Sequence, residues 1–581
     1  MEKKPTYEEL EKRISELEYE LKINKKYGLV WDKEDTKEDV VLHCEKDIPI
    51  FIQEKSRRII TNAGENNVLI EGDNYHVLTA LNFVLKETID IIYIDPPYNT
   101  GENDFTYNDN YVDSDDGYRH SKWLSFMEKR LKLARELMKK DAVLFLSIGD
   151  DEVNNIGLLL NNIFGENNFI GLLPRIGKKS GKTTSTIAKN HDFLFIYAKD
   201  KSCITFARQS IERDESKLEQ DEFFEERGPY RLNQCLDYDS LTYSTSMDYP
   251  LEIDGQIFYA GGSKDAWEKR QNGQHSKFDW TWRWSPSLVK FGLSNGFIVI
   301  KKGKRTRLYT KTYTKVSIQV INGEYSIVKT DDSKSYQSIV FLDNIYSNDN
   351  AKKELASLGL KDKFDFPKPT SLIKTCIKMA GKKDPVVLDF FAGSGTTGQA
   401  VMELNSEDGG HRRFILCTNN ENNICTDITY PRLKTVISGI RQDGTKYSEG
   451  LPNNLFYFKT DFVKDESNTE QARYSLVEKV DGLLCIAENI FEEVERNDYS
   501  SHYQSKNRHL FIFNDYYSKE KFDEFKNRIL KADGSKIVYI YSSDNNVDPS
   551  LIIDKDVIIK AIPSKIYEIY KEIVEGIKRG E

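Results

Sequence analysis

The stretch IDIIYIDPPYNTG, which begins at Ile89, places an acid, two prolines and a tyrosine directly after an apolar run. Pro96 and Pro97 lack the backbone N–H that a strand ladder uses, so the predicted strand must end at Asp95. In open α/β sheets, ligands bind just beyond the carboxyl ends of the strands. Asp95, the Pro96 carbonyl and the Tyr98 ring would stand at such an edge and offer two hydrogen-bond acceptors beside an aromatic face. Alone, the same residues also fit an ordinary turn.

A second stretch with chemical potential is VVLDFFAGSGTTGQAV, in which Asp389 ends a predicted strand and Gly393, Gly395 and Gly398 precede a predicted helix. The glycines spell G-x-G-x-x-G, the dinucleotide fingerprint. Glycine is needed wherever backbone approaches a ligand closely, so nicotinamide, flavin and S-adenosylmethionine sites all remain open. A dinucleotide site expects an acid about 20 residues further on. Glu421 meets that expectation, so this test does not separate the three ligands.

Two basic stretches favour a path for DNA. One is RIGKKSGK, which begins at Arg175. Overlapping it, GKKSGKT at 177–183 looks like a phosphate loop, but Gly177 and Gly181 enclose three residues where a Walker A motif has four. The preceding GLLPRI is also expected to be a poor strand. We therefore interpret it as a basic loop near the substrate. KKGKRTRLYTKTYTK at 301–315 contains no acid, in a chain whose net charge is −10. Charge runs are usually solvated faces, yet two such runs interleaved with Tyr and Thr favour nucleic acid.

The elements that must position these residues follow an α/β pattern. From 66 to 200, predicted strands and amphipathic helices alternate, which predicts a parallel sheet built from β-α-β units. Residues 201–345 change to short predicted strands rich in Tyr and Trp, and we interpret them as an insertion. In its FDWTWRWSP stretch at 278–286, every second residue is Trp, so the three rings would share one face of a strand. Such a row of rings more often belongs to a core than to a ligand site. Strand and helix patterns return at 384–420, and the segment from 441 suffices for a small α/β domain.

The bulk composition excludes several classes of protein. With 581 residues, 39% hydrophobic and 30% charged, the chain is long enough for three or four domains. We find no apolar run that approaches the ~20 residues needed to span a bilayer. The first residues are also unlike a signal peptide. We therefore expect a cytoplasmic protein that does not bind membranes. The seven cysteines show no C-x-x-C pair, which argues against a disulfide framework or a zinc site.

Further patterns concern assembly. Tyr7, Leu10, Ile14, Leu17 and Leu21 have the a/d spacing of a short coiled coil, so this helix either pairs with its copy in a dimer or packs on the body.

In combination, DPPY at 95–98 and FAGSGT at 391–396 resemble the motifs of β-class DNA adenine-N6 methyltransferases, which use S-adenosylmethionine and carry the catalytic motif before the cofactor loop. Three other stretches resemble the modification (Mod) subunits of Type III restriction-modification systems: EGDN at 71–74, YRHSKWLSFMEKRL at 118–131 and FDFPKPTSLIK at 364–374. The resemblance covers roughly residues 60–460. It implies a Rossmann-like methyltransferase sheet with circularly permuted motif order, an inserted target-recognition domain and a small C-terminal α/β domain.

The heptad, strand and helix patterns together with the resemblance predict an order of domains along the chain. These are an N-terminal coiled coil or helix at 1–28, a first methyltransferase part at 29–200, a target-recognition domain at 201–345, a second methyltransferase part at 346–440, and a C-terminal α/β domain at 441–581 for partner or dimer contacts.

The implied reaction explains the residue types in DPPY. An adenine amino group is a poor nucleophile because its lone pair is delocalised into the ring. If Asp95 and the Pro96 carbonyl each accept one amino hydrogen, the lone pair can localise and attack the sulfonium methyl. The base must leave the duplex to reach this platform, with Tyr98 as its stacking partner. The implied catalytic residues are Asp95, Pro96, Pro97 and Tyr98.

The resemblance assigns the cofactor residues and His191, and the two basic stretches supply the lysines and arginines expected to hold DNA. S-adenosylmethionine would be held by Asp73, Phe366, Lys368, Thr370, Asp389, Phe391, Ala392, Gly393, Gly395, Thr396, Thr397, Asn419 and Glu421. DNA would be held by Lys178, Lys179, Lys182, His191, Lys302, Lys304, Arg305 and Arg307. The ribose contact stays open between Asn419, Asn420 and Glu421, and His191 fits a structural role at a strand edge equally well.

The leading hypothesis is a Type III-like modification subunit that methylates adenine N6 in duplex DNA as a homodimer. Cleavage would need a separate restriction subunit with ATPase and nuclease activity, because we identify neither a Walker A motif nor a nuclease cluster in the sequence. One alternative is N4-cytosine methylation, which DPPY does not exclude. A dinucleotide-dependent oxidoreductase and a catalytically idle DNA-binding scaffold are the others, and both leave DPPY without a role.

Overall fold

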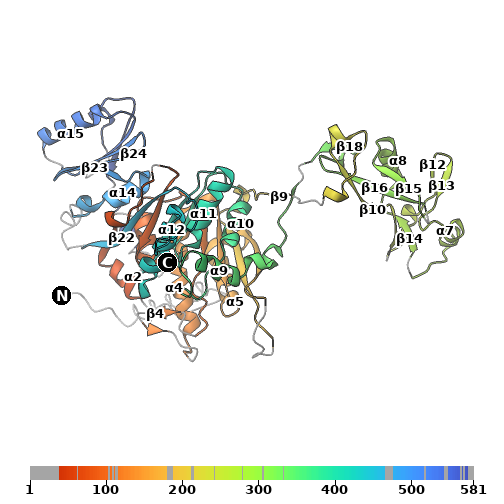
Figure 1. Ribbon diagram of the computed structural model, residues 1–581, viewed down its shortest axis with the longest axis horizontal. Helices are drawn as coiled ribbons and strands as arrows, with labels where there is room; N and C mark the ends of the chain where they lie inside the picture. Colours follow the sequence, from red (N-terminus) through yellow and green to blue (C-terminus); the bar gives the residue numbers. More distant parts are fainter. Residues whose placement is uncertain are drawn as a thin grey trace, which may run out of the picture. The chain divides into compact units, whose positions relative to one another are not determined.

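The chain forms two compact units in the computed structural model (Figure 1). The main unit comprises Met1–Ala207 and Gln337–Glu581, and the inserted unit comprises Arg208–Tyr336, which falls inside the insertion expected at 201–345. The structure describes residues 38–61, 63–101, 105–107, 110–111, 116–179, 187–210, 215–240, 242–277, 279–303, 306–330, 333–464, 475–515, 518–541, 547–562, 566 and 570–573. The expected coiled coil at 1–28 lies outside the described residues, as do Lys182, Lys304 and Arg305.

A nine-stranded mixed sheet forms the centre of the main unit. In spatial order its strands are β1 (Asp47–Gln53), β22 (Asn454–Lys464), β2 (Asn66–Glu71), β21 (Arg413–Thr418), β20 (Val386–Asp389), β3 (Ile89–Ile94), β6 (Met138–Ile148), β8 (His191–Ala198) and β7 (Phe169–Ile176). The strands from β22 to β6 are parallel, and every residue of β3 is buried. Because β3 and β20 are neighbours, DPPY and the glycine loop leave the sheet at the same edge. The α/β methyltransferase-type sheet with permuted motif order is therefore confirmed.

The sheet departs from the expected all-parallel arrangement at both ends. At one end β1 runs antiparallel to β22. At the other end β8 runs antiparallel to both β6 and β7. The GLLPRI stretch, expected to be a poor strand, belongs to β7, so that expectation was wrong. β7 is the last strand of the sheet, and an edge strand tolerates Pro174 because it can turn the side that lacks an N–H to solvent.

The main sheet also continues further along the chain than expected. β22 pairs with β1 and β2, and its Leu455–Phe458 segment is buried between them. The predicted start of a C-terminal domain at 441 is therefore too early, because it cuts off a strand that completes the core of the main sheet.

Helices cover both faces of this sheet. Side chains of α3 (Asn74–Asn82), α4 (Arg119–Leu137) and α5 (Val153–Phe164) share one core with Ile92 and Ile94 of β3. The opposite face meets α10 (Thr370–Ala380), whose buried Leu372, Cys376 and Ala380 recur every four residues as in an amphipathic helix. α10 packs on α11 (Thr396–Asp408), which contacts α12 (Tyr430–Ser438). Shorter elements of the unit are α2 (Asp39–Cys44), α9 (Asn348–Ser357), β4 (Thr106–Tyr107) and β5 (Asn110–Tyr111).

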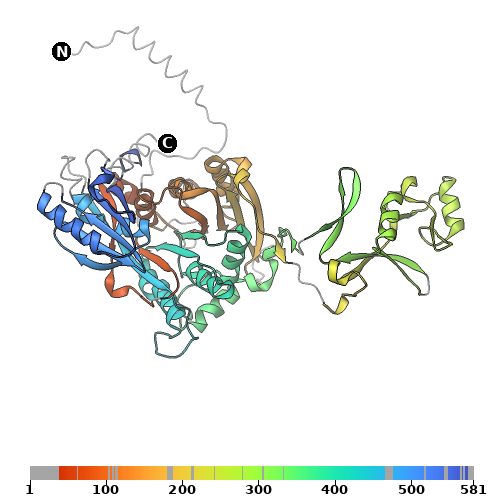
Figure 2. The same ribbon diagram turned by 90° about the horizontal axis from the view of Figure 1, so that it is seen from above.

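The C-terminal segment forms a second, five-stranded sheet, but it belongs to the same compact unit as the main sheet. Its sheet has the order β23 (Glu492–Arg496), β24 (Ser500–Ser505), β25 (Arg508–Phe513), β26 (Ser535–Tyr541) and β27 (Val557–Ile562). One face packs with α14 (Asp481–Glu488) into the core of the main sheet, through residues such as Leu484 and Leu510. The other face is covered by α15 (Lys519–Lys531) (Figure 2). Phe525 and Ile529 of this helix are fully buried.

The inserted unit consists of short strands around small cores. Its strands are β10 (Tyr230–Cys235), β16 (Arg307–Tyr313) and β15 (Ile298–Lys301) in one sheet, and four pairs: β11 (Asp237–Ser240) with β14 (Asp279–Trp282), β12 (Leu251–Ile253) with β13 (Gln256–Phe258), β17 (Val316–Ile321) with β18 (Glu324–Lys329), and β9 (Gln209–Ser210) with β19 (Ser333–Lys334). Its helices are α6 (Phe224–Arg227), α7 (Lys264–Gln271) and α8 (Pro286–Ser294). Trp282 is buried in a cluster against which Trp280 and Trp284 pack, so the tryptophan stripe belongs to a core.

Among the described residues, no helix is long and apolar enough to cross a membrane. The seven cysteines are free thiols, and the described side chains form no cluster suited to a metal ion.

Candidate active site

A cavity of about 1170 Å³ opens at the edge of the main sheet where the parallel strands end. Its lining includes Asp73 and Asn74 after β2, Asp95, Pro96, Pro97 and Tyr98 after β3, Gly149, Asp150 and Asp151 after β6, Phe390, Phe391 and Gly393 after β20, and Thr418, Asn419, Glu421 and Asn422 at and beyond the end of β21. Both sequence motifs therefore face one cavity, as the carboxyl ends of parallel strands in an open α/β sheet predict.

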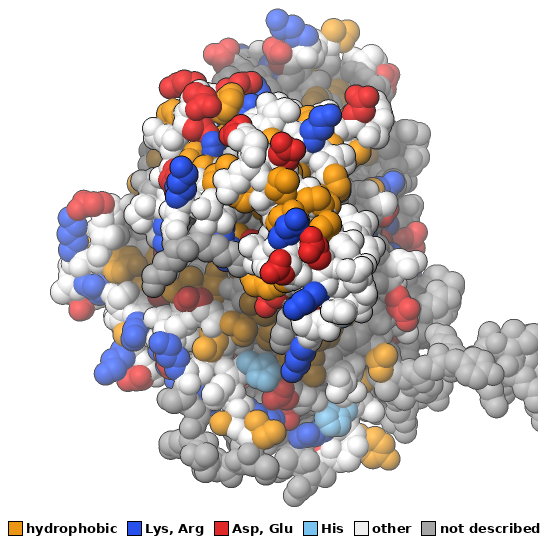
Figure 3. Space-filling view, turned by 90° about the vertical axis from the view of Figure 1, so that its right-hand side faces the viewer, with side chains coloured by type: hydrophobic (Ala, Val, Ile, Leu, Met, Phe, Trp, Pro, Cys, Tyr) orange, Lys and Arg blue, Asp and Glu red, His pale blue; other side chains and the backbone are white. Residues whose placement is uncertain are grey.

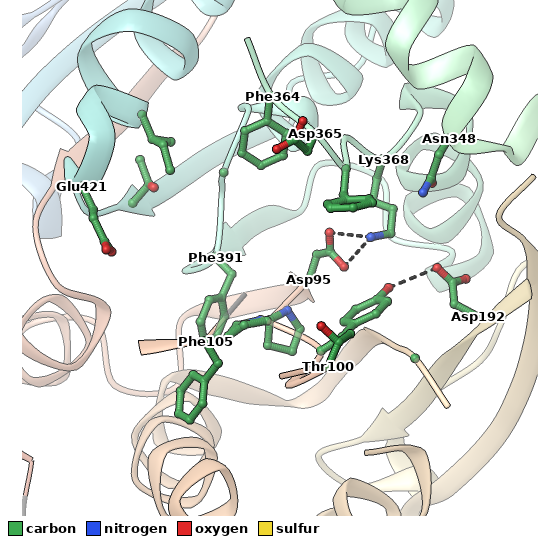
Figure 4. Close-up of a pocket in the computed structure, with 18 of the residues that line it drawn as sticks. Asp95, Thr100, Phe105, Asp192, Asn348, Phe364, Asp365, Lys368, Phe391 and Glu421 are labelled. Carbon is green, nitrogen blue, oxygen red and sulfur yellow. Dashed lines mark hydrogen bonds and ion pairs between the residues drawn. The ribbon is translucent and has the colours of Figure 1, made fainter. Parts of the chain in front are cut away.

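The Asp95 carboxylate is held by a lysine from a distant part of the chain. Lys368 Nζ donates to both Asp95 oxygens at 2.6 Å (Figure 4). The Lys368 side chain is 5% exposed, and its ammonium also lies 5.0 Å from the centroid of the Tyr98 ring. Lys368 precedes α10, with Pro369 at the N-cap, and its carbonyl accepts a hydrogen bond from Thr396 Oγ1 at 3.1 Å. One residue thus connects the DPPY motif to the start of α11.

Tyr98 stands at the end of a buried polar chain. Its hydroxyl donates to Asp192 Oδ2 at 3.1 Å (Figure 4), and Asp192 accepts from Arg175 Nε at 2.7 Å. Arg175 is fully buried and also donates to the Tyr346 carbonyl at 2.7 Å. Burial, then Asp192 and Asp95, raise the pKa of Tyr98 well above its usual value, so the ring stays a neutral phenol. A Cβ at Gly149 would lie 2.7 Å from this ring, which explains the glycine there.

A tryptophan fixes the proline platform. The indole N–H of Trp123, a fully buried residue of α4, donates to the Pro97 carbonyl at 2.8 Å. Because Pro96 and Pro97 have no N–H, this bond is one of few by which the backbone at DPPY can be anchored. Trp123, Arg175 and Asp192 were not among the predicted site residues. Trp123 lies within a stretch identified only by resemblance. Arg175 was counted as the first residue of a basic stretch, whereas the structure buries this residue in the core.

The glycine loop is held from behind by Asp389. Its carboxylate accepts from the Phe391 N–H at 3.0 Å and from Thr397 Oγ1 at 2.6 Å, and burial raises its pKa to about 7. Gly393 lines the cavity with φ +47°, in the left-handed region, and Gly398 lies where a Cβ would come within 2.6 Å of Leu433. One glycine therefore opens the cavity wall and the other permits close packing of α11 on α12.

The structure places the predicted cofactor residues in two groups. Those that line the cavity are Asp73, Phe366, Lys368, Phe391, Gly393, Asn419 and Glu421. Those that lie outside its lining are Thr370, Asp389, Ala392, Gly395, Thr396 and Thr397. The second group supports the loop rather than facing the cavity.

Two of the three residues proposed for a ribose contact face the cavity. Asn419 and Glu421 line it, and Asn419 Nδ2 lies 3.3 Å from Glu421 Oε2. The Asn420 side chain is absent from the lining and accepts from the Thr426 N–H at 3.1 Å. Asn419 and Glu421 thus remain as the ribose candidates.

The cavity wall on the α3 side is organised by a buried arginine. Asp73 caps α3 by accepting from the Tyr75 N–H at 2.7 Å, and Arg130 Nη2 lies 3.5 Å from the same carboxylate. Arg130 also pairs with Glu38 at 2.9 Å and is 1% exposed. The Asp73 carboxylate is therefore fixed at the cavity rather than free to turn away.

The predicted DNA contacts occupy different settings. Lys178 and His191 line the cavity, whereas Lys179 is exposed outside it. In the inserted unit Lys302 is exposed, but Arg307 Nη2 is paired with Asp237 at 2.9 Å. On the face drawn in Figure 3, Lys and Arg side chains are interspersed with Asp and Glu. Charge alone does not mark a DNA path on that face.

Known proteins resemble this chain over more than half of its length. A family model described as DNA methylase matches residues 89–430. The chain is 32% identical over 406 residues to the Type III restriction-modification enzyme EcoPI Mod subunit of Escherichia phage P1. This match covers 62% of this chain and 58% of that protein. It is 31% identical over 402 residues to the Type II methyltransferase M.KpnI of Klebsiella pneumoniae, which covers 66% of this chain and 88% of that protein.

Solved structures show a weaker similarity. The M1.HpyAVI–SAM complex is 12% identical with a TM-score of 0.26, over 63% of this chain and 98% of that one. The chain is 32% identical to each of two Type III Mod subunits. It spans only 58% and 56% of the length of these two proteins. The family match includes β3, DPPY, the inserted unit and the glycine loop in one continuous range. The chain therefore belongs to the DNA methylase family.

Proposed function

We propose that the protein transfers a methyl group from S-adenosylmethionine to N6 of an adenine flipped out of duplex DNA. The observation that carries the proposal is the convergence of the Asp95 carboxylate, the Tyr98 ring and the Gly393 backbone on a single cavity. The first two suit an exocyclic amino group on a stacked base, and the third suits a cofactor that needs close backbone approach.

The cavity fits S-adenosylmethionine in charge and shape. The acids Asp73, Asp95 and Glu421 suit a sulfonium compound with an ammonium group and ribose hydroxyls, and Lys368 is a buried cation suited to its carboxylate. Phe391 and Ile428 give the same cavity an apolar wall for an adenine ring. When bound, the group supplies an electrophilic methyl carbon. The cavity volume of about 1170 Å³ leaves room for a base beside the cofactor.

The residues at DPPY would activate the amino nitrogen. Asp95 and the Pro96 carbonyl each accept one amino hydrogen, which localises the nitrogen lone pair and directs it away from both acceptors. Tyr98 holds the base by stacking, while Asp192 fixes the Tyr98 hydroxyl. As the N–C bond forms, the nitrogen becomes acidic and releases a proton, for which Asp95 is the nearest acceptor in this arrangement. Positioning and electrostatics supply the rate enhancement.

The biological setting is inferred from the relatives. The names of the Type III relatives describe Mod subunits, which supports a modification subunit that acts with a separate restriction subunit. The inserted unit, Arg208–Tyr336, would serve target recognition. The heptad pattern supports a homodimer, and the composition supports a cytoplasmic location.

The proposal is tested by incubating the purified protein and duplex DNA with radiolabelled S-adenosylmethionine, followed by digestion to nucleosides. We expect label in N6-methyladenine. Label in N4-methylcytosine would favour the alternative, and absence of transfer with intact cofactor binding would refute both. Asp95→Ala should abolish transfer and retain cofactor binding; Asp150→Ala, which removes another acid of the same cavity, is the matched control.

A further inference from the structure

One exposed arginine of the inserted unit is held ready for a ligand. Arg283 follows β14, and its N–H donates to the Leu236 carbonyl at 2.8 Å, which extends the β11–β14 ribbon by one residue. Its Nε donates to the Cys235 carbonyl at 3.1 Å, and its guanidinium lies 4.3 Å from the centroid of the Tyr238 ring. The side chain is thus held through Nε and over one ring.

The ring beneath Arg283 is itself fixed. Tyr238 pairs with Thr281 across the ribbon, on the face opposite Trp282, which is buried in the core. The hydroxyls of Ser240 and Thr281, and then Arg283, lower the pKa of Tyr238, which places these groups around the phenol. The result is an outward face on which an aromatic ring carries a cation.

Other arginines of this unit are already committed. Arg307 pairs with Asp237, Arg270 with Asp248, and Arg227 donates to the Asn295 carbonyl and stacks on Phe223. By contrast, no carboxylate among the described residues lies within ion-pair distance of Arg283. Arg307, which the sequence suggested as a DNA contact, has Nε and Nη2 bonded to Asp237, whereas Nη1 and Nη2 of Arg283 have no partner among the described residues.

We infer that Arg283 reads a guanine of the DNA target through the major groove. A two-stranded ribbon fits that groove, and the two terminal nitrogens of a guanidinium match guanine O6 and N7. Stacking on Tyr238 holds the fork in a fixed plane, so little side-chain freedom is lost when the base is bound. The inference rests on the proposed function and adds a specificity-determining residue to it.

The test is to sequence methylated positions in a methylation-free host that expresses the full chain. The wild-type protein should mark one motif that contains a G·C pair. Arg283→Ala and Arg283→Lys should methylate sites in which that single pair is replaced, with discrimination at that position reduced about tenfold or more, while other positions stay fixed. The lysine variant keeps the charge but not the fork, so charge and geometry are separated.

Arg231→Ala is the matched control, since it removes an exposed arginine from the same unit. It should weaken methylation evenly across sites if it acts at all. A wild-type motif without a G·C pair, unchanged discrimination in both Arg283 variants, or an even loss like that of Arg231→Ala would overturn the inference. A wild-type protein that marks no DNA would instead refute the proposed function.

Discussion

Lys368 Nζ bridges both carboxylate oxygens of Asp95 at 2.6 Å and lies 5.0 Å from the centre of the Tyr98 ring. In the proposed reaction, an adenine amino group must donate to that carboxylate and its ring must stack on Tyr98. The ammonium therefore occupies part of the space assigned to the base. Because a carboxylate has about four lone-pair positions, Lys368 can share Asp95, but it cannot keep this central position when the base enters.

We expect Lys368→Met to lower the rate of methyl transfer about 10- to 100-fold and to lower the melting temperature. The reason is that Asp95, 23% exposed, would lose the cation that fixes its orientation. Lys368→Arg should retain most of the stability. Steady-state kinetics measure the rate of methyl transfer, and thermal melts measure the melting temperature. Lys378→Met is the control, because Lys378 is half exposed and pairs with Glu407 on the surface; equal losses in both variants would contradict a specific role.

Tyr98 has two separable parts, the ring and the hydroxyl. Tyr98→Ala should lower kcat/KM for DNA about 10- to 100-fold, because stacking of a base on an aromatic ring contributes about 1–3 kcal/mol. Tyr98→Phe removes only the bond to Asp192 and should cost less than tenfold. Calorimetry should show unchanged cofactor binding in both variants. If the phenylalanine variant were as impaired as the alanine variant, hydrogen bonding rather than stacking would be the function of this residue.

Loss of the Arg175–Asp192 pair should lower the stability of the protein, and any effect on catalysis should follow from that loss. Arg175→Met would leave the carboxylate of Asp192, whose side chain is 10% exposed, without its bidentate partner, which destabilises a buried site by about 3–5 kcal/mol. Chemical denaturation measures that loss. Adding Asp192→Asn should recover part of it, since the uncompensated charge is gone, and Lys189→Met at a 65% exposed position should change nothing. An additive double variant would argue against coupling.

The parts of the site that sequence could predict are local. The apolar run of β3 and the two prolines define where the strand ends, and the glycines define the loop after β20, because each depends on neighbours in the chain. The Lys368–Asp95 contact joins residues 273 positions apart and depends on how β3 and α10 pack. No pattern in the sequence marks that contact, so the resemblance could suggest Lys368 as a cofactor residue but not as a partner of Asp95.

Buried polar partners were missed for a related reason. Trp123 and Asp192 show their roles only through single hydrogen bonds to Pro97 and Tyr98, and one hydrogen bond leaves no periodic signal. The resemblance implied that Asp389 contacts the cofactor. Its two oxygens are instead taken by the Phe391 N–H and by Thr397, which only the folded loop reveals.

Asp389 also predicts a pH dependence of stability. Burial raises its pKa from 3.8 to about 7 in the folded protein. The folded state therefore retains a proton that the unfolded state releases above about pH 4. The stabilising contribution of this proton is fully present below that pH and is lost as the pH rises through 7. Raising the pH should thus weaken the glycine loop, although Thr397 and the Phe391 N–H partly compensate the charge.

Asp389→Asn isolates this contribution, because an amide keeps the shape of the carboxyl group and does not ionise. Between pH 5 and pH 8, the free energy of unfolding of the wild-type protein should fall relative to that of the variant by about 2–3 kcal/mol, at about 1.4 kcal/mol for each pH unit below 7. Urea denaturation of both proteins across this range measures the difference. If the free energies of unfolding of the two proteins changed in parallel with pH, Asp389 would be ionised throughout this range. The Thr397 hydroxyl and the Phe391 N–H would then stabilise a buried carboxylate rather than a protonated acid.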